Sequence, residues 1–303
     1  MTATRTNADW ASLIDAARAS IRPASAAAPT PNPVASRLRQ PISAYIDHTQ
    51  LSPTATAAQI AQLCTEATSQ AFAAVCVRPG HVAAASSQVR ASATTPAPPP
   101  PCVAVACVVG FHEGDQATAA KVAEAQRAVA DGAAELDVVL NRAMLGRCDY
   151  EGVVAELRAL RSAVPDRVCV KLILETSQLG VEQVVAACVL AGYAGCDFVK
   201  TSTGFCGRGA SVEDVLLMSA VAEYLEGQGV GRRDGEGRFV RMKVKASGGV
   251  RSFDDAVRMI GAGAQRIGTS SGMKIVQEAK TTMGSQVESA SNDAAVSRGP
   301  NDY

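Results

Sequence analysis

The chain has 303 residues, 47% of them hydrophobic, which is enough for one large domain with a full core or for two small ones. Its 29 basic and 29 acidic residues cancel, and only 4% of the residues are aromatic, which disfavours a nucleic-acid partner. No apolar run reaches the roughly 18 residues that a membrane helix needs, so we expect no membrane association.

The N-terminal region differs in composition from the rest of the chain. Apolar residues recur there at the spacing of an amphipathic helix, namely at Trp10, Leu13, Ile14 and Ala17. Residues 24–32 are rich in Ala, Pro and Thr and are typical of a linker. We therefore expect an N-terminal extension over residues 1–40, a main domain over residues 41–283, and a polar, flexible tail over residues 284–303.

From Ser43 onward, short β-branched runs alternate with Ala-rich helical patterns. The predicted strands are Ala44–Ile46, Ala74–Val77, Val103–Val109, Leu136–Leu140, Val168–Ile173, Phe198–Thr201, Val240–Ala246 and Arg266–Gly268. The predicted helices are Ala57–Ser69, Thr118–Ala130, Tyr150–Ala163, Val181–Ala191, Val212–Glu226 and Phe253–Ala262. Two segments read as surface insertions: the proline-rich residues 91–101, and residues 227–237, which we expect to form a mobile loop.

The number and composition of these repeats indicate the fold class. Apolar strands are typical of a parallel sheet that is buried on both faces. Eight β/α repeats over about 230 residues fit a (β/α)₈ TIM barrel of the α/β class better than an open doubly wound sheet. In such a barrel the chemistry lies at the carboxyl ends of the strands.

Lysines stand on three consecutive predicted strands. The chain has 22 arginines and only seven lysines, yet Lys171, Lys200 and Lys245 fall on strands 5, 6 and 7. Only an amine can lose its proton near neutral pH and attack a carbonyl, because guanidinium stays charged. The alternative is compositional chance together with buried ion pairing to Asp137 and Asp47, and some pairing must exist under either interpretation.

A lysine amine becomes a nucleophile when a second cation lies close and the site is partly desolvated. Lys200 and Lys245 on neighbouring strands would form such a pair. The amine would add to an aldehyde and lose water, and the resulting imine would allow the neighbouring carbon–carbon bond to break. Asp137, with a water that it holds, could move protons in these steps.

Two glycine-rich loops follow the last two predicted strands. They are Ser247-Gly248-Gly249 and Gly268-Thr269-Ser270-Ser271. Loops at these positions are the usual phosphate site of the fold, because backbone N–H groups and hydroxyls can reach the oxygens. The sequence therefore predicts a small phosphorylated aldehyde or sugar as substrate.

Cysteine and histidine patterns argue against a metal site. The nine cysteines form no Cys-x-x-Cys pair, and several lie in apolar runs, so we expect free thiols in a cytoplasmic protein. The three histidines, His48, His81 and His112, are dispersed, without the spacing of a zinc site.

Seven segments resemble the deoxyribose-phosphate aldolase family, and together they span about residues 43–277. They are Tyr45–Pro53, Val75–Pro79, Glu135–Asn141, Lys171–Thr176, Asp197–Phe205, Val244–Val250 and Arg266–Gly272. The resemblance implies a class I aldolase that reversibly cleaves 2-deoxy-D-ribose 5-phosphate to acetaldehyde and D-glyceraldehyde 3-phosphate, in deoxyribonucleoside catabolism. It also implies that the enzyme needs no metal or organic cofactor. Barrels of this kind often pair, and the choice between a homodimer and a homotetramer stays open.

The resemblance assigns roles residue by residue. It implies that Lys200 forms the Schiff base, that Lys245 is the neighbouring cation that favours the neutral amine, and that Asp137 transfers protons. Supporting active-site residues would be Asp47, Lys171 and Thr49. Phosphate ligands would be Gly204, Gly248, Gly249, Gly268, Ser270 and Ser271. Some members use a tyrosine near the C-terminus, so Tyr303 is a candidate proton relay beside Asp137.

The chain departs from the family pattern at three positions. His112 stands where the family usually has a proline, and we expect it in solvent, the alternative being a role at the mouth of the site. Ser52 replaces a lysine, and Lys243 stands where a small residue is common, sharing a face with Lys245 if the strand is regular.

Two competing functions remain: another Schiff-base sugar-phosphate aldolase, and an inactive barrel that binds phosphometabolites.

Overall fold

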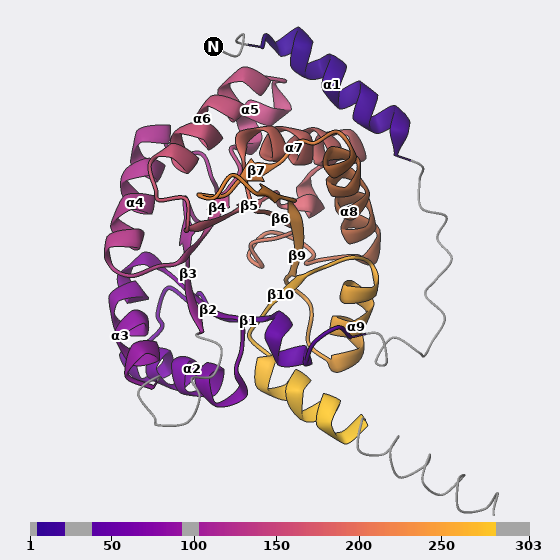
Figure 1. The fold of residues 1–303 in the computed structure, drawn as a ribbon. Helices are drawn as coiled ribbons and strands as arrows, with labels where there is room; N and C mark the ends of the chain where they lie inside the picture. Colours follow the sequence, from indigo (N-terminus) through magenta and orange to yellow (C-terminus); the bar gives the residue numbers. More distant parts are fainter. Residues whose placement is uncertain (1–4, 22–37, 93–102, 283–303) are drawn as a thin grey trace, which may run out of the picture.

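The computed structural model describes residues 5–21, 38–92 and 103–282. Figure 1 looks down the axis of a closed ring of strands, and helices surround this ring. The barrel strands are β1 (Ile46–Gln50), β2 (Ala74–Val77), β3 (Ala104–Val109), β4 (Glu135–Val139), β5 (Cys169–Ile173), β6 (Phe198–Lys200), β9 (Lys243–Ser247) and β10 (Arg266–Thr269). They pair in parallel in chain order, and β10 closes onto β1. The predicted (β/α)₈ barrel is therefore confirmed.

Helices follow the strands and cover the outside of the ring. They are α2 (Ala57–Gln70), α3 (Val82–Ser92), α4 (Thr118–Ala130), α5 (Arg142–Gly146), α6 (Tyr150–Ser162), α7 (Val181–Ala194), α8 (Val212–Gly227), α9 (Phe253–Gly261) and a last helix over residues 272–282. Short 3₁₀ turns occupy Ile42–Tyr45, Pro79–His81 and Thr176–Gln178. Side-chain caps fix several starts: Thr56 and Ser252 each accept a backbone N–H of the first turn of α2 and α9, respectively.

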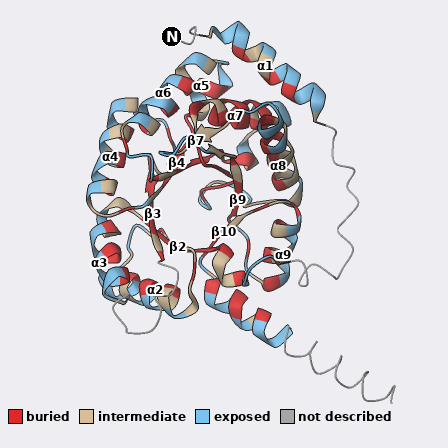
Figure 2. Cartoon of the chain, in the orientation of Figure 1, coloured by how far each residue is buried: buried red, intermediate tan, exposed pale blue. Residues whose placement is uncertain are grey.

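Strand alternation separates two chemical environments. Outward-facing residues of the strands, such as Val75, Val105 and Val170, join the helices in one apolar core. Figure 2 shows this as buried strands and buried inner helix faces beneath exposed outer faces. Small inward-facing residues of β2 and β3, including Cys76 and Ala106, leave space inside the ring for long side chains from the other strands.

The N-terminal helix α1 (Asn7–Ser20) packs outside the barrel, against α6, α7 and α8 (Figure 1). Trp10, Ile14 and Ala17 of the predicted apolar stripe are buried, and Leu13 is partly buried against the same core. The Trp10 ring meets the Tyr193 ring of α7 edge-on, with ring centroids 5.3 Å apart. The linker and the tail lie outside the described residues, so the division of the chain at residues 40 and 283 stays a prediction.

The sequence misplaced some element boundaries. Ala44 and Tyr45 belong to a 3₁₀ turn, because the first strand begins at Ile46. Val240 does not begin a barrel strand: it pairs with Arg232 in the small hairpin of β7 (Arg232–Arg233) and β8 (Phe239–Val240). Part of the segment 227–237, expected as a loop, is therefore a strand. Helices α3 and α5 and the last helix over residues 272–282 were not predicted, and most of the proline-rich insertion lies outside the described residues.

Two further expectations from the sequence concern the cysteines and membrane association. All eight cysteines in the described part of the chain are free, and Cys102 lies outside it. Among the helices that the structure describes, none combines the length and the apolar character that crossing a membrane would require.

Candidate active site

A layer of seven charged side chains fills the inside of the barrel. Its members come from six strands: Asp47, Glu135, Asp137, Lys171, Lys200, Lys245 and Arg266. The strand register brings them together, because Asp137 lies beside Lys171 and Lys200 lies beside Lys245 on neighbouring strands. Charged groups inside a fold are costly unless they are paired, and the layer meets this requirement through mutual contacts.

Asp137 lies at the centre of the layer and is fully buried. Its Oδ1 accepts a hydrogen bond from Lys171 Nζ at 2.7 Å, and its Oδ2 accepts from Lys200 Nζ at 2.7 Å and from Lys245 Nζ at 2.8 Å. Burial acts to raise the pKa of Asp137, but the charges of the three lysines outweigh it and hold that pKa well below its usual range. Asp137 is therefore a carboxylate at neutral pH.

Lys171 and Lys245 are held as cations by more than one carboxylate each. Lys171 Nζ lies 2.5 Å from Glu135 Oε2 as well as against Asp137, and Lys245 Nζ also donates to Asp47. Burial acts to lower the pKa of both lysines, but the neighbouring carboxylates raise it above its ordinary value. Neither amine is free to act as a nucleophile near neutral pH.

The charges of the layer do not balance. Four cations face three carboxylates: Arg266, the fourth cation, contacts Asp47 at 2.9 Å and Glu135 at 2.5 Å. Among the described residues, Lys200 contacts one carboxylate oxygen only, Asp137 Oδ2, and shares it with Lys245. Lys200 thus has fewer carboxylate contacts than Lys171 or Lys245.

A cavity of about 290 Å³ opens above this layer, at the carboxyl ends of the strands. Lys200 lines it and is only 3% exposed, whereas Lys171 and Lys245 lie beneath it and do not reach its wall. Other predicted site residues also line the cavity: Thr49, Gly204, Gly248, Gly249, Gly268 and Ser270. The barrel therefore presents one amine of the charged layer to a ligand-sized space.

The rim of the cavity is built from backbone that glycine makes accessible. Gly204, Gly248 and Gly249 have φ values of +85°, +80° and +78°, a conformation that side chains rarely adopt. A Cβ on Gly268 would lie 2.2 Å from Ser247 Oγ, so glycine is needed there for strand packing. The helix after β10 begins at Gly272, two residues past Ser270, and its N-terminal N–H groups favour an anion.

Comparisons with known proteins agree with this geometry. Residues 42–278 match the DeoC/LacD family of aldolases. The chain belongs to that family. It is 46% identical over 239 residues to the deoxyribose-phosphate aldolase of Coccidioides immitis, covering 79% of this chain and 81% of that protein. It is 45% identical over 242 residues to the deoxyribose-phosphate aldolase of Thermococcus kodakarensis, covering 80% and 98% of the two chains.

Solved structures show the same relationship. A Coccidioides immitis crystal structure superposes with a TM-score of 0.77 at 42% identity, covering 91% of this chain and 99% of that one. The tetrameric deoxyribose phosphate aldolase of Aeropyrum pernix gives a TM-score of 0.68 at 31% identity, covering 82% and 96%. The family and the fold that the sequence predicted are both confirmed.

Some predicted residues of this DeoC/LacD aldolase are not at the cavity. Ser271 lies just outside its wall, where its N–H donates to Thr269 Oγ1 at 2.9 Å. Lys243 shares the inward face of β9 with Lys245, as expected, but its Nζ lies 5.6 Å from the Phe198 ring centroid, in a second cavity at the opposite end of the barrel. Tyr303 lies outside the described residues.

The structure also adds residues that the sequence did not single out. Arg251 lines the cavity and brings a second positive charge to it. Glu175 is buried below the rim, where it accepts from Thr203 N at 3.1 Å and from the Thr203 hydroxyl, so it fixes the loop after β6. Both residues follow barrel strands, and this position was the available signal; neither stands out by residue type.

Proposed function

We propose that this aldolase reversibly cleaves 2-deoxy-D-ribose 5-phosphate through a Schiff base on Lys200. The observation that carries the proposal is the position of Lys200: it touches both the charged layer and the cavity. The named relatives act as deoxyribose-phosphate aldolases, and the cavity combines an amine with a glycine-rich rim that suits a phosphate.

The reaction follows from the chemistry of a primary amine. Lys200 Nζ adds to the C1 aldehyde of the open-chain sugar, and loss of water gives a protonated imine. The imine accepts the electron pair of the C2–C3 bond as the proton leaves the C3 hydroxyl, which releases D-glyceraldehyde 3-phosphate. The enamine then takes a proton at C2, and water hydrolyses the imine to acetaldehyde and the free amine.

The buried layer supports these steps electrostatically. Lys171 and Lys245 remain cations, and a cation close to a lysine amine in a partly desolvated site is the setting in which such an amine acts as a nucleophile. Asp137 accepts a hydrogen bond from that amine, and we assign it the transfer of protons between Lys200 and water. Its lowered pKa makes it a poor acid on its own, so we propose that the enamine takes its proton from a water held by Asp137 or from Tyr303.

The phosphate would lie at the rim, against Gly204, Gly248, Gly249, Gly268 and Ser270, with Arg251 beside them. Backbone N–H groups and one hydroxyl would bind its oxygens there. Asp47 and Thr49 would act as supporting residues, because Asp47 holds Lys245 and Thr49 lines the cavity next to β1. We further propose a cytoplasmic homo-oligomer; the Aeropyrum pernix relative is tetrameric.

The experiment that tests this function is a substrate panel with purified protein. We expect deoxyribose 5-phosphate to yield equal amounts of acetaldehyde and glyceraldehyde 3-phosphate, each measured by a coupled dehydrogenase. A Schiff-base aldolase of another specificity would instead cleave a different phosphorylated sugar in the panel. Binding of the sugar phosphate by calorimetry with no products from any substrate would favour the inactive barrel and contradict the proposal.

A further inference from the structure

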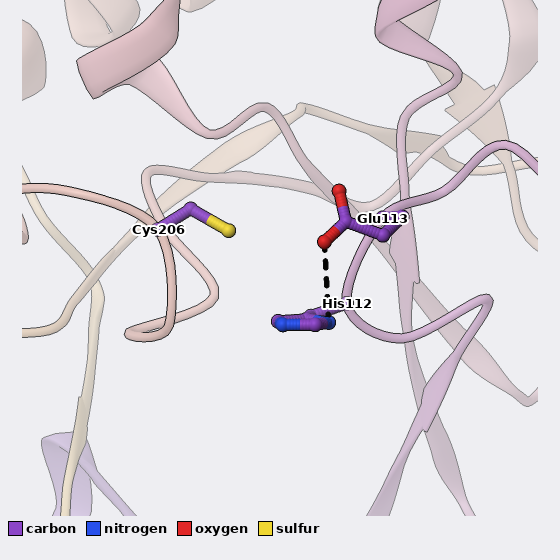
Figure 3. Close-up of side chains that lie close together, drawn as sticks. All are labelled: His112, Glu113 and Cys206. Carbon is purple, nitrogen blue, oxygen red and sulfur yellow. Dashed lines mark ion pairs between the residues drawn. The ribbon is translucent and has the colours of Figure 1, made fainter.

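Three potential metal ligands converge at the mouth of the barrel, away from the charged layer. His112 and Glu113 lie in the loop after β3, and Cys206 lies in the loop after β6. Figure 3 shows the Cys206 thiol directed toward the Glu113 carboxylate, with the His112 ring beside both. The ligand atoms of all three lie within 4.8 Å of one another, and His112 Nδ1 is 3.6 Å from Glu113 Oε1.

Their chemistry selects a particular class of cation. Thiolate and imidazole together favour Zn²⁺ over Mg²⁺ or Ca²⁺, and a carboxylate completes a three-ligand set with room for water. Arg142 Nη2 contacts the other carboxylate oxygen, Glu113 Oε2, at 3.3 Å, which orients Oε1 toward the histidine. We propose that His112, Glu113 and Cys206 form a Zn²⁺ site that links the two loops.

Binding would need only small movements of the three side chains. Ligand atoms around tetrahedral Zn²⁺ lie about 3.3–3.8 Å apart, given metal–ligand distances near 2.0–2.3 Å. The His112–Glu113 separation already meets this, and the exposed side chains of His112 and Glu113, at 38% and 54%, can close on Cys206. The thiol loses its proton to solvent on binding, and the thiolate and carboxylate neutralise the charge of the ion.

The site is joined to the cavity through Phe205. This residue precedes Cys206, lines the cavity, and meets the His112 ring edge-on with centroids 5.4 Å apart. Phe205 also packs against Phe111, and the Arg78 guanidinium lies over both rings. An ion that bridges the loops would hold Phe205 in place, so Zn²⁺ slows substrate entry and product release. This consequence rests on the proposed aldolase function.

Metal binding can be measured independently of activity. Calorimetric titration of chelator-treated protein with Zn²⁺ should show one site per chain, and Co²⁺ should give a thiolate-to-metal charge-transfer band. Cys206→Ser should weaken Zn²⁺ binding at least about 10-fold and abolish the band, and His112→Ala should weaken binding similarly. Cys148→Ser is the matched control, because Cys148 is an exposed free thiol elsewhere in the chain, and it should change neither result.

Each alternative outcome has a definite meaning. Absence of Zn²⁺ binding to the unaltered protein, or a Co²⁺ band that survives in Cys206→Ser, would overturn the site. If the site binds but Zn²⁺ slows turnover equally in the unaltered protein and in Cys206→Ser, the link to Phe205 is wrong. If the unaltered protein has no aldolase activity, the titrations still decide the metal site, so the two proposals fail separately.

Discussion

Two buried lysines of this barrel occupy contrasting environments. Lys121 lies on α4 between helix and sheet, where its Nζ contacts Glu156 at 2.7 Å and the Val139 carbonyl at 3.0 Å. Lys200 lies inside the barrel, in a layer with four cations and three carboxylates. Lys121 has its own carboxylate, whereas Lys200 shares one and faces a cavity.

The two environments distinguish a structural lysine from a reactive one. Burial alone does not do so, because both side chains are nearly inaccessible. Charge pairing and access to the cavity do distinguish them: a lysine with its own carboxylate is suited to a structural ion pair, whereas a lysine in a layer with an excess of cations, at a cavity wall, is suited to react. Four substitutions test this contrast.

Lys200→Arg should have the largest effect. Guanidinium can still pair with Asp137 but cannot form an imine, so we expect turnover of deoxyribose 5-phosphate to fall by at least about 10⁴-fold. Steady-state kinetics would measure the loss, and circular dichroism would show whether the fold is kept. Retained turnover would remove the distinction between the two lysines.

Asp137→Asn should come next, because it removes the carboxylate that joins the three lysines. We expect turnover to fall by about 10²–10⁴-fold. Because the folded-state pKa of Asp137 is lowered, its stabilising effect is present above its unfolded pKa of about 3.9 and is lost progressively as pH falls below that value toward the folded-state pKa. Denaturant unfolding between about pH 5 and 3 should therefore show a weaker pH dependence in Asp137→Asn. An unchanged pH dependence would mean that Asp137 does not carry this stability.

Lys121→Met should affect stability rather than chemistry. Within the described part of the chain, the substitution leaves the buried Glu156 with the Thr118 hydroxyl as its one remaining partner, at 3.1 Å. We expect the free energy of unfolding to fall by about 3–5 kcal/mol, with turnover per folded molecule unchanged. The double variant Lys121→Met with Glu156→Leu should recover much of the loss. A specific loss of turnover in Lys121→Met would show that this lysine also serves the reaction.

Ser270→Ala should have the smallest effect. It tests whether the cavity that Lys200 lines binds the substrate phosphate at its rim. Losing one hydroxyl donor should raise KM about 10-fold for deoxyribose 5-phosphate and leave KM for unphosphorylated deoxyribose unchanged. Ser271→Ala is the matched comparison, because Ser271 lies beyond the cavity wall, and it should change KM less. Equal effects on both sugars would argue against phosphate binding at this rim.

Much of the fold could be predicted because its signals are local. Helix α4 matches its predicted bounds, and β2 does too, because apolar periodicity and turn residues mark both ends. The errors occurred where tertiary context, rather than local sequence, determines the secondary structure. Val240 has strand-like neighbours but pairs in a hairpin outside the barrel, and Ala44 looks like strand but lies in a turn that leads into β1.

The candidate site was predictable in part for the same reason. Strand ends in a closed barrel converge, so Lys171, Lys200 and Lys245 could be placed together from their strands alone. Their exact partners could not, since the pairing inside the layer depends on how the side chains pack: Arg266 contacts both Asp47 and Glu135. The His112 side chain is 38% exposed, in keeping with the expected solvent position, but the packing of its ring against Phe205 was not predicted, because the two residues lie in separate loops and no spacing in the sequence joins them.

The central claim is that Lys200 is the reactive amine, and borohydride trapping tests it most directly. The protein is incubated with acetaldehyde or deoxyribose 5-phosphate, reduced with borohydride, digested and mapped by mass spectrometry. We predict a stable two-carbon adduct from acetaldehyde on the peptide that carries Lys200, and no adduct in Lys200→Arg. An adduct on Lys171 or Lys245, or no adduct in the unaltered protein, would contradict the account.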